Sequence, residues 1–142
     1  MTMRVLTIHE PYASLIAQGI KKYETRHCQT KYRGKIAIHA AKKTPITLGQ
    51  MQKLYAEIRE QGADPSSNIK FPFGKIVAIA DLVNIYLIEP QLPVSPLERL
   101  VGNWDYGRYA WHLQNIEVLR IPVPMRGMQG LQMLPKEIDL CP

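Results

Sequence analysis

The stretch GIKKYETRHCQTKYRGKIAIHA, residues 19–40, contains the features that decide the predicted fold. Residues 11–18 begin with a proline, place apolar side chains on one helical face and stop at the first glycine of this stretch, as a short helix does. Side chains then alternate with strand periodicity over residues 22–28. A glycine-containing turn leads into a second strand at 35–40. Residues 11–40 therefore predict a helix, a strand, a turn and a strand in close succession.

Working outward, residues 3–9 alternate like a strand that precedes the helix. Thr47 followed by Gln50 is a capping-box pattern, which predicts a helix that ends just before Gly62. The apolar run 76–88 predicts one long buried strand or a bent pair of strands.

A second capping signature, Ser95 with Pro96 and Glu98, predicts a short helix that ends near Gly102. Two further strands are expected at 109–113 and 116–121. The total is about five or six strands with two or three helices, a mixed α+β composition. This count fits a small barrel with helices packed at its ends better than a doubly wound parallel sheet.

Length and composition favour one globular domain spanning residues 1–142. Hydrophobic residues make up 46% of the chain and charged residues 21%, which is ordinary for a globular protein. No apolar run approaches the roughly 20 residues that cross a bilayer, and the N-terminus lacks the features of a signal peptide, so we expect a cytoplasmic protein without membrane association. Cys28 and Cys141 are expected to be reduced thiols.

Positive charge is concentrated in one segment. Residues 21–43 contain eight Lys and Arg and only one acidic residue, Glu24, for a net charge of +7, whereas the whole chain carries +6. A basic patch on an otherwise neutral body attracts polyanions. A solvated basic face without a ligand is the alternative.

Within this segment Gly19, Lys21, Glu24 and Arg26 form the strongest local constellation. Strand periodicity puts Glu24 and Arg26 on one face, with Lys21 at the junction after the helix. Lys21 and Arg26 can hold an anion while Glu24 accepts hydrogen bonds from a base edge. The simpler interpretation of Glu24 with Arg26 is an ion pair without a ligand.

These four residues, together with the stretches 6–8, 11–13 and 32–39, resemble an ASCH domain, the activating-signal-cointegrator homology family of the PUA-like superfamily. The segments 74–79, 108–113 and 126–131 follow in plausible family order. The resemblance implies a small PUA-like β-barrel whose cleft binds RNA or another nucleic acid.

Some small proteins of the same superfamily are amidohydrolases on an acetylated cytidine nucleoside, and they use a lysine-activated threonine. Here Lys21 is present, but the position three residues later is Glu24, and Thr25 is expected on the opposite strand face. If the chain is an enzyme, the resemblance leaves Lys21 and Glu24 to activate a water.

Further candidates for ligand contacts lie outside this motif. Trp104 and Tyr106 lie in a glycine-flanked loop, where an exposed ring can stack on an unpaired base, whereas Trp111 is expected in the core. Arg126 can contact a phosphate and Gln129 a base edge. His39 is expected near the cleft as a hydrogen-bond donor. No histidine or cysteine spacing indicates a metal site, and no cofactor motif is present.

Three hypotheses follow. The first is a module that binds single-stranded RNA or a modified nucleotide in a basic cleft built from Lys21, Glu24 and Arg26. In this hypothesis the cleft is supported by His39, Trp104, Arg126 and Gln129. The second is an amidohydrolase acting on a modified nucleoside. The third is a protein-interaction domain whose basic face meets an acidic partner.

Overall fold

The computed structural model describes residues 3–66 and 70–140; Cys141 lies outside this range. Its elements, in chain order, are β1 (Arg4–Ile8), α1 (Tyr12–Ala17), β2 (Tyr23–Arg26), β3 (Gly34–Ala40), α2 (Leu48–Glu60), β4 (Lys75–Leu87), α3 (Pro96–Leu100), β5 (Tyr109–Pro124) and β6 (Leu131–Met133). The strands form one sheet in the order β2-β5-β4-β3-β1-β6. β1 runs parallel to β3, and every other pair is antiparallel.

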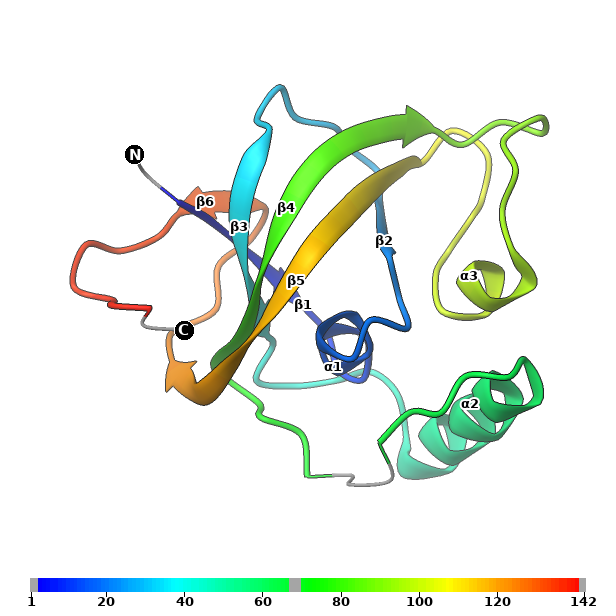
Figure 1. Cartoon of the computed structure of the whole chain (residues 1–142), viewed down its shortest axis with the longest axis horizontal. Coiled ribbons are helices and arrows are strands. Elements are labelled where there is room, and N and C mark those ends of the chain that lie inside the picture. The colour runs from blue at the N-terminus through cyan, green and yellow to red at the C-terminus, as the bar shows by residue number, and fades with distance from the viewer. Residues whose placement is uncertain (1–2, 67–69, 141–142) are drawn as a thin grey trace.

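The long strands β4 and β5 curl the sheet into a half-barrel around α1 (Figure 1). The inner face is therefore concave and carries the largest core. Buried side chains of β1, β3, β4 and β5 pack there against Ala13 and Ile16 of α1. Trp111 belongs to this core and is 1% exposed, as predicted.

Two separate groups of side chains cover the outer face. The chain after β5 packs Met125, Met128 and Leu134 against Val5 and Ala37. At the other end of the sheet, the connection between β4 and β5 packs Trp104 and Ile88 against Ala110 of β5.

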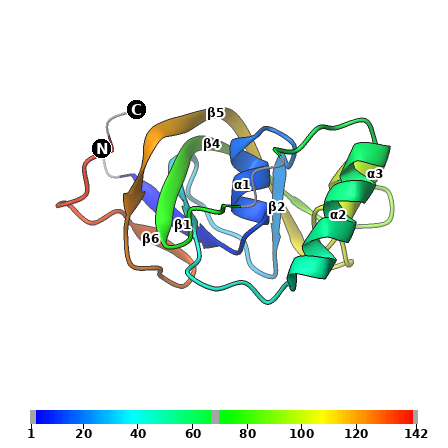
Figure 2. The same ribbon diagram turned by 90° about the horizontal axis from the view of Figure 1, so that it is seen from below.

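The other two helices lie side by side at one end of the half-barrel (Figures 1 and 2). Met51, Tyr55 and Ile58 of α2 form a second core with Leu15 and Val101. The predicted capping box is present, because the Thr47 hydroxyl accepts from the Gln50 amide and the Gln50 side chain accepts from the Thr47 amide. The helix ends before Gly62, as expected.

Most predicted elements are confirmed, with two corrections at the C-terminal side. The two strands expected at 109–113 and 116–121 are one strand, β5, which passes through Asn115 at a φ of 53°. β6 was not predicted, because its three residues owe their extended form to pairing with β1. β4 is one strand whose register shifts at three places. In the described part of the chain, no helix has the length and apolar character needed to span a membrane.

Candidate functional site

The end of α1 positions Lys21. Gly19 adopts a φ of 76°, and the amides of Ile20 and Lys21 both donate to the carbonyl of Leu15. This reversal turns the Lys21 side chain inward, where it is 2% exposed. Its Nζ donates a hydrogen bond of 2.6 Å to the carbonyl of Val101 and lies 5.6 Å from the centre of the Tyr12 ring.

Strand β2 places the two other charged groups of the motif beside Lys21. Glu24 Oε1 lies 3.7 Å from Lys21 Nζ, and Glu24 Oε2 accepts a hydrogen bond of 3.1 Å from Arg26. The Arg26 guanidinium also lies 6.0 Å from the Trp111 ring centre. Glu24 and Arg26 therefore share the inner face, as predicted, and Glu24 bridges two cations.

Lys21 and Glu24 border a cavity of about 350 Å³, and Arg26 is held to Glu24 outside its lining. Seven residues that the sequence did not single out as ligand contacts complete its wall together with Lys21 and Glu24. The lining is His9, Tyr12, Lys21, Glu24, Thr25, Val101, Gly102, Asn103 and Arg108. Only the position of three of these residues in the sequence could have indicated them. His9 and Tyr12 flank the predicted strand-to-helix junction, and Arg108 precedes a predicted strand.

Burial shapes the electrostatics of this cavity, which we call the motif pocket. Desolvation lowers the pKa of Lys21, and the charges of Glu24 and Glu98 partly oppose that shift. Desolvation together with the charge of Glu24 raises the pKa of Tyr12. Arg108 donates to the carbonyl of Thr25 at 3.0 Å, while its buried Nε has no partner among the described residues. The motif pocket therefore combines the Glu24 carboxylate with the Lys21 ammonium and the Arg108 guanidinium.

Thr25 contributes to the wall of the motif pocket, although it alternates with Glu24 along β2. Its hydroxyl accepts a hydrogen bond of 3.2 Å from the amide of Asn103. The hydroxyl thus holds the loop after α3 against the edge of β2.

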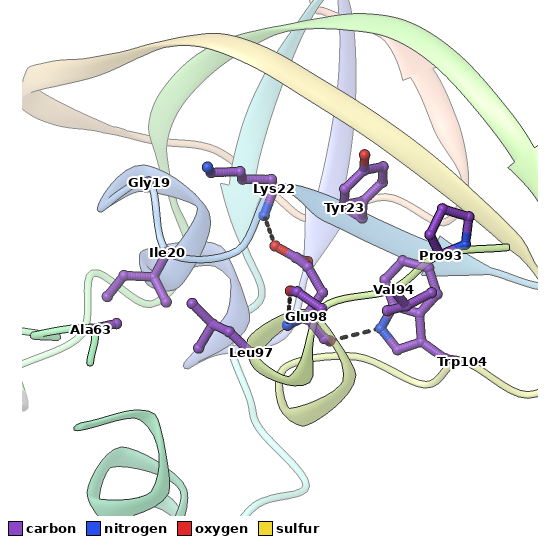
Figure 3. A pocket seen from close by; sticks show the side chains of 11 residues that line it. Gly19, Ile20, Lys22, Tyr23, Ala63, Pro93, Val94, Leu97, Glu98 and Trp104 are labelled. Atoms are coloured by element: carbon purple, nitrogen blue, oxygen red, sulfur yellow. Dashed lines mark hydrogen bonds between the residues drawn. The ribbon is translucent and has the colours of Figure 1, made fainter. Parts of the chain in front are cut away.

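Glu98 of α3 connects this loop to β2. Its Oε2 accepts from the amide of Lys22 at 3.0 Å, and its carbonyl accepts from Trp104 Nε1 at 2.7 Å. Figure 3 shows Glu98 between Lys22 and Trp104, beside a second hollow of about 370 Å³. Desolvation raises the pKa of this buried carboxyl. Glu98 thereby fixes the loop whose Val101 carbonyl receives Lys21.

The prediction that Trp104 is exposed is wrong. It is 9% exposed, whereas Tyr106 in the same loop is 67% exposed. The loop folds back because the indole nitrogen reaches the end of α3 and the ring packs edge-on against Tyr23, with centroids 5.7 Å apart. Trp104 contributes to the outer-face core and does not line the motif pocket.

The structure does not bring His39, Arg126 and Gln129 together with the motif. His39 is fully buried, and its ring nitrogens bond to Thr7 Oγ1 and the Met125 carbonyl. The expected position near the cleft is therefore wrong, because His39 pairs with Thr7 on the outer face. Arg126 and Gln129 are exposed on the segment that covers this face.

Cys28 is an exposed free thiol. Within residues 3–66 and 70–140, no group of three His, Cys, Asp or Glu side chains could hold a metal ion.

A curled six-stranded sheet with three helices and a polar pocket beside the first helix defines an α+β, PUA-like fold. The ASCH domain family model matches residues 6–121, and the chain belongs to this family.

Activating signal cointegrator 1 from Homo sapiens is 35% identical over 81 residues, which are 56% of this chain and 14% of that protein. The Mus musculus protein is 33% identical over the same shares. The chain therefore matches only a small part of these relatives. The crystal structure of ASCH from Zymomonas mobilis has a TM-score of 0.57 at 15% identity, covering 95% of this chain and 89% of that one. The crystal structure of a mutant of this Zymomonas mobilis protein has a TM-score of 0.56 at 16% identity, and the match covers 96% of this chain and 93% of that one.

Proposed function

We propose that the chain is a binding module for single-stranded RNA or a modified nucleotide, and that the motif pocket is its binding site. The observation that carries this proposal is the chain of charges Lys21, Glu24 and Arg26, of which Lys21 and Glu24 line a cavity of about 350 Å³. Cavities of roughly 300–1,000 Å³ are typical of small-ligand sites. One nucleoside unit is therefore the part of a nucleic acid that we expect inside.

The cationic groups favour an anionic ligand. Arg26 and Arg108 are partly exposed, and guanidinium groups bind phosphate in a bidentate manner. Lys21 has three donors and gives one to Val101, which leaves hydrogens for Glu24 and for a ligand. The net charge of +7 over residues 21–43 adds long-range attraction.

Base recognition is assigned to Glu24 and Tyr12. A carboxylate accepts hydrogen bonds, and base edges present amino and imino donors to such a group. Tyr12 offers a flat ring beside it. Family membership supports the same direction, since ASCH domains are generally related to RNA binding.

The second candidate function is an amidohydrolase on a modified nucleoside. It is favoured by one observation: burial lowers the pKa of Lys21 beside Glu24 in the pocket. An amine with a lowered pKa and an adjacent carboxylate are groups that can move a proton from water.

The test is a salt titration of binding to a short single-stranded RNA. The variants are Arg26→Gln, Lys21→Met and, as a matched control, Lys31→Gln, which removes an exposed cation of the same basic segment. We expect salt-sensitive binding by the parent, with a smaller salt slope by about 0.7 for each lost phosphate contact on a single strand. Lys21→Met and Arg26→Gln should weaken binding more than Lys31→Gln.

Equal effects of all three variants would contradict a site at the motif pocket. Binding that ignores salt would contradict a phosphate contact. The hydrolase is tested by incubating the parent and Lys21→Met with acetylated cytidine. Turnover by the parent and not by the variant would favour that function, and equal turnover would remove it.

A further inference from the structure

We propose that Tyr23, His112 and Tyr86 form an aromatic platform on the outer face of the sheet, and that it stacks an unpaired base of a single-stranded nucleic acid. This inference deepens the proposed function, on which it rests, by adding a second contact outside the motif pocket. Lys22, at the edge of the platform, would contact a phosphate of the same strand.

Three neighbouring strands assemble the platform. Tyr23 of β2 and Asn84 of β4 are both register partners of His112 on β5. The Tyr23 and His112 rings are stacked, with centroids 4.5 Å apart and planes at 15°. Tyr86, two residues after Asn84, lies 6.5 Å from His112 at 42°. The three rings therefore form one cluster across β2, β5 and β4. Because Tyr23 and His112 stack on each other, Tyr86 is the ring of the cluster that is most open to a base.

The platform is both accessible and rigidly supported. Tyr86 is 37% exposed, and Tyr23 and His112 are half-buried. Trp104 packs edge-on behind Tyr23, and the Tyr86 hydroxyl accepts from Asn84 at 3.3 Å. Preformed rings lose little freedom when a base stacks on them. Trp104, which sequence reasoning placed in contact with the base, instead supports Tyr23 from within the fold.

The surroundings match the charge of a nucleic-acid strand. Both backbone groups of Lys22 are fixed, by Glu98 and by Leu113, while its side chain is exposed. Hollows of about 370 and 380 Å³ lie on either side of Lys22, and Tyr23 lines one while His112 lines the other. The Lys22 ammonium, with a hollow and a flat ring on each side, is therefore suited to contact a backbone phosphate whose neighbouring bases lie against the rings.

The platform is separate from the motif pocket, because none of Tyr23, Tyr86 and His112 lines that pocket. Tyr23 lies on the outer face with His112, whereas Glu24 lies on the inner face with Trp111. A nucleic-acid strand that contacts both the platform and the motif pocket would pass the end of β2, where Lys21 and Lys22 are adjacent. It would place one base in the motif pocket and another on the platform.

The test compares binding of a short oligouridylate with binding of an abasic strand of equal length and charge. The variants are Tyr86→Leu, Tyr86→Phe and the control Phe73→Leu, since Phe73 is similarly exposed at 39% and lies outside the platform. Tyr86→Leu should weaken oligouridylate binding by about fivefold or more, the loss expected for one stacked base. Tyr86→Phe and Phe73→Leu should bind like the parent, and the abasic strand should not distinguish the variants. Thermal unfolding verifies that each variant is folded.

Oligouridylate binding that is equal in Tyr86→Leu and the parent would overturn the platform and leave the motif pocket in place. If Tyr86→Leu weakens oligouridylate binding and neither Arg26→Gln nor Lys21→Met does, the platform stands. The motif pocket is then overturned as a binding site for the oligonucleotide. A parent that binds neither strand would overturn the platform, while nucleoside binding would still test the pocket.

Discussion

Replacing Trp104 by Phe tests whether this residue holds the loop that carries the Lys21 acceptor. The change keeps an aromatic ring and removes the indole nitrogen that donates to the Glu98 carbonyl at 2.7 Å. A residue that stacks on a ligand from an exposed loop would affect binding and leave stability unchanged. A buried brace would affect stability first.

The expected cost follows from the contacts. The Glu98 carbonyl also accepts from the Val101 amide at 3.2 Å, so it keeps one partner and the loss is near the net value of one hydrogen bond, about 1 kcal/mol. The smaller ring leaves space in a site where Trp104 is 9% exposed, and incomplete repacking adds roughly another 1 kcal/mol. We expect Trp104→Phe to lower the free energy of unfolding by about 2 kcal/mol.

Urea unfolding of the parent and the variant measures this difference, with an unchanged m-value as the sign that both unfold in the same way. Tyr106→Phe is the matched control, because Tyr106 belongs to the same loop and is 67% exposed; its effect should stay within about 0.5 kcal/mol. A Trp104→Phe variant as stable as the parent would refute the bracing role.

Two further predictions concern the same loop. Gly102→Ala should weaken ligand binding at the motif pocket in an RNA-binding titration, because the added Cβ would lie 3.3 Å from Lys21 Nζ and 3.0 Å from Trp104 Nε1, both held by hydrogen bonds; unchanged binding would show that Lys21 can shift freely. Glu98→Gln should remove a pH dependence of stability. Burial raises the pKa of the Glu98 carboxyl from 4.5, so the folded protein binds the carboxyl proton more tightly than the unfolded chain does. The free energy of unfolding of the parent therefore falls as the pH rises above 4.5. Urea unfolding across this range should show the parent losing stability relative to Glu98→Gln, and parallel curves would contradict the assignment.

Local sequence signals predicted the elements around the site. The glycine after α1, the alternation along β2 and the capping box of α2 act within a few residues, so they could be identified without a fold. The shared face of Glu24 and Arg26 follows from strand periodicity alone. β6 and the continuity of β5 escaped prediction, because pairing with distant strands decides both.

The second capping signature shows where local reasoning stops. Ser95 caps α3 as predicted, but the Glu98 carboxylate accepts from Lys22, 76 positions away, and Oε1 has no partner among the described residues. A residue can satisfy a local pattern with its backbone while its side chain serves a distant contact.

The sequence by itself determined the order of helices and strands, the basic segment 21–43 and the Lys21, Glu24 and Arg26 constellation, because each depends on spacing between near neighbours. Only the tertiary structure decided which face each aromatic and histidine occupies. It buried Trp104 and His39, placed His9, Tyr12 and Arg108 around the motif pocket, and exposed Tyr86 beside His112. Those outcomes depend on how the curled sheet brings distant strands and loops together. Side-chain spacing along one strand carries no information about these distant contacts.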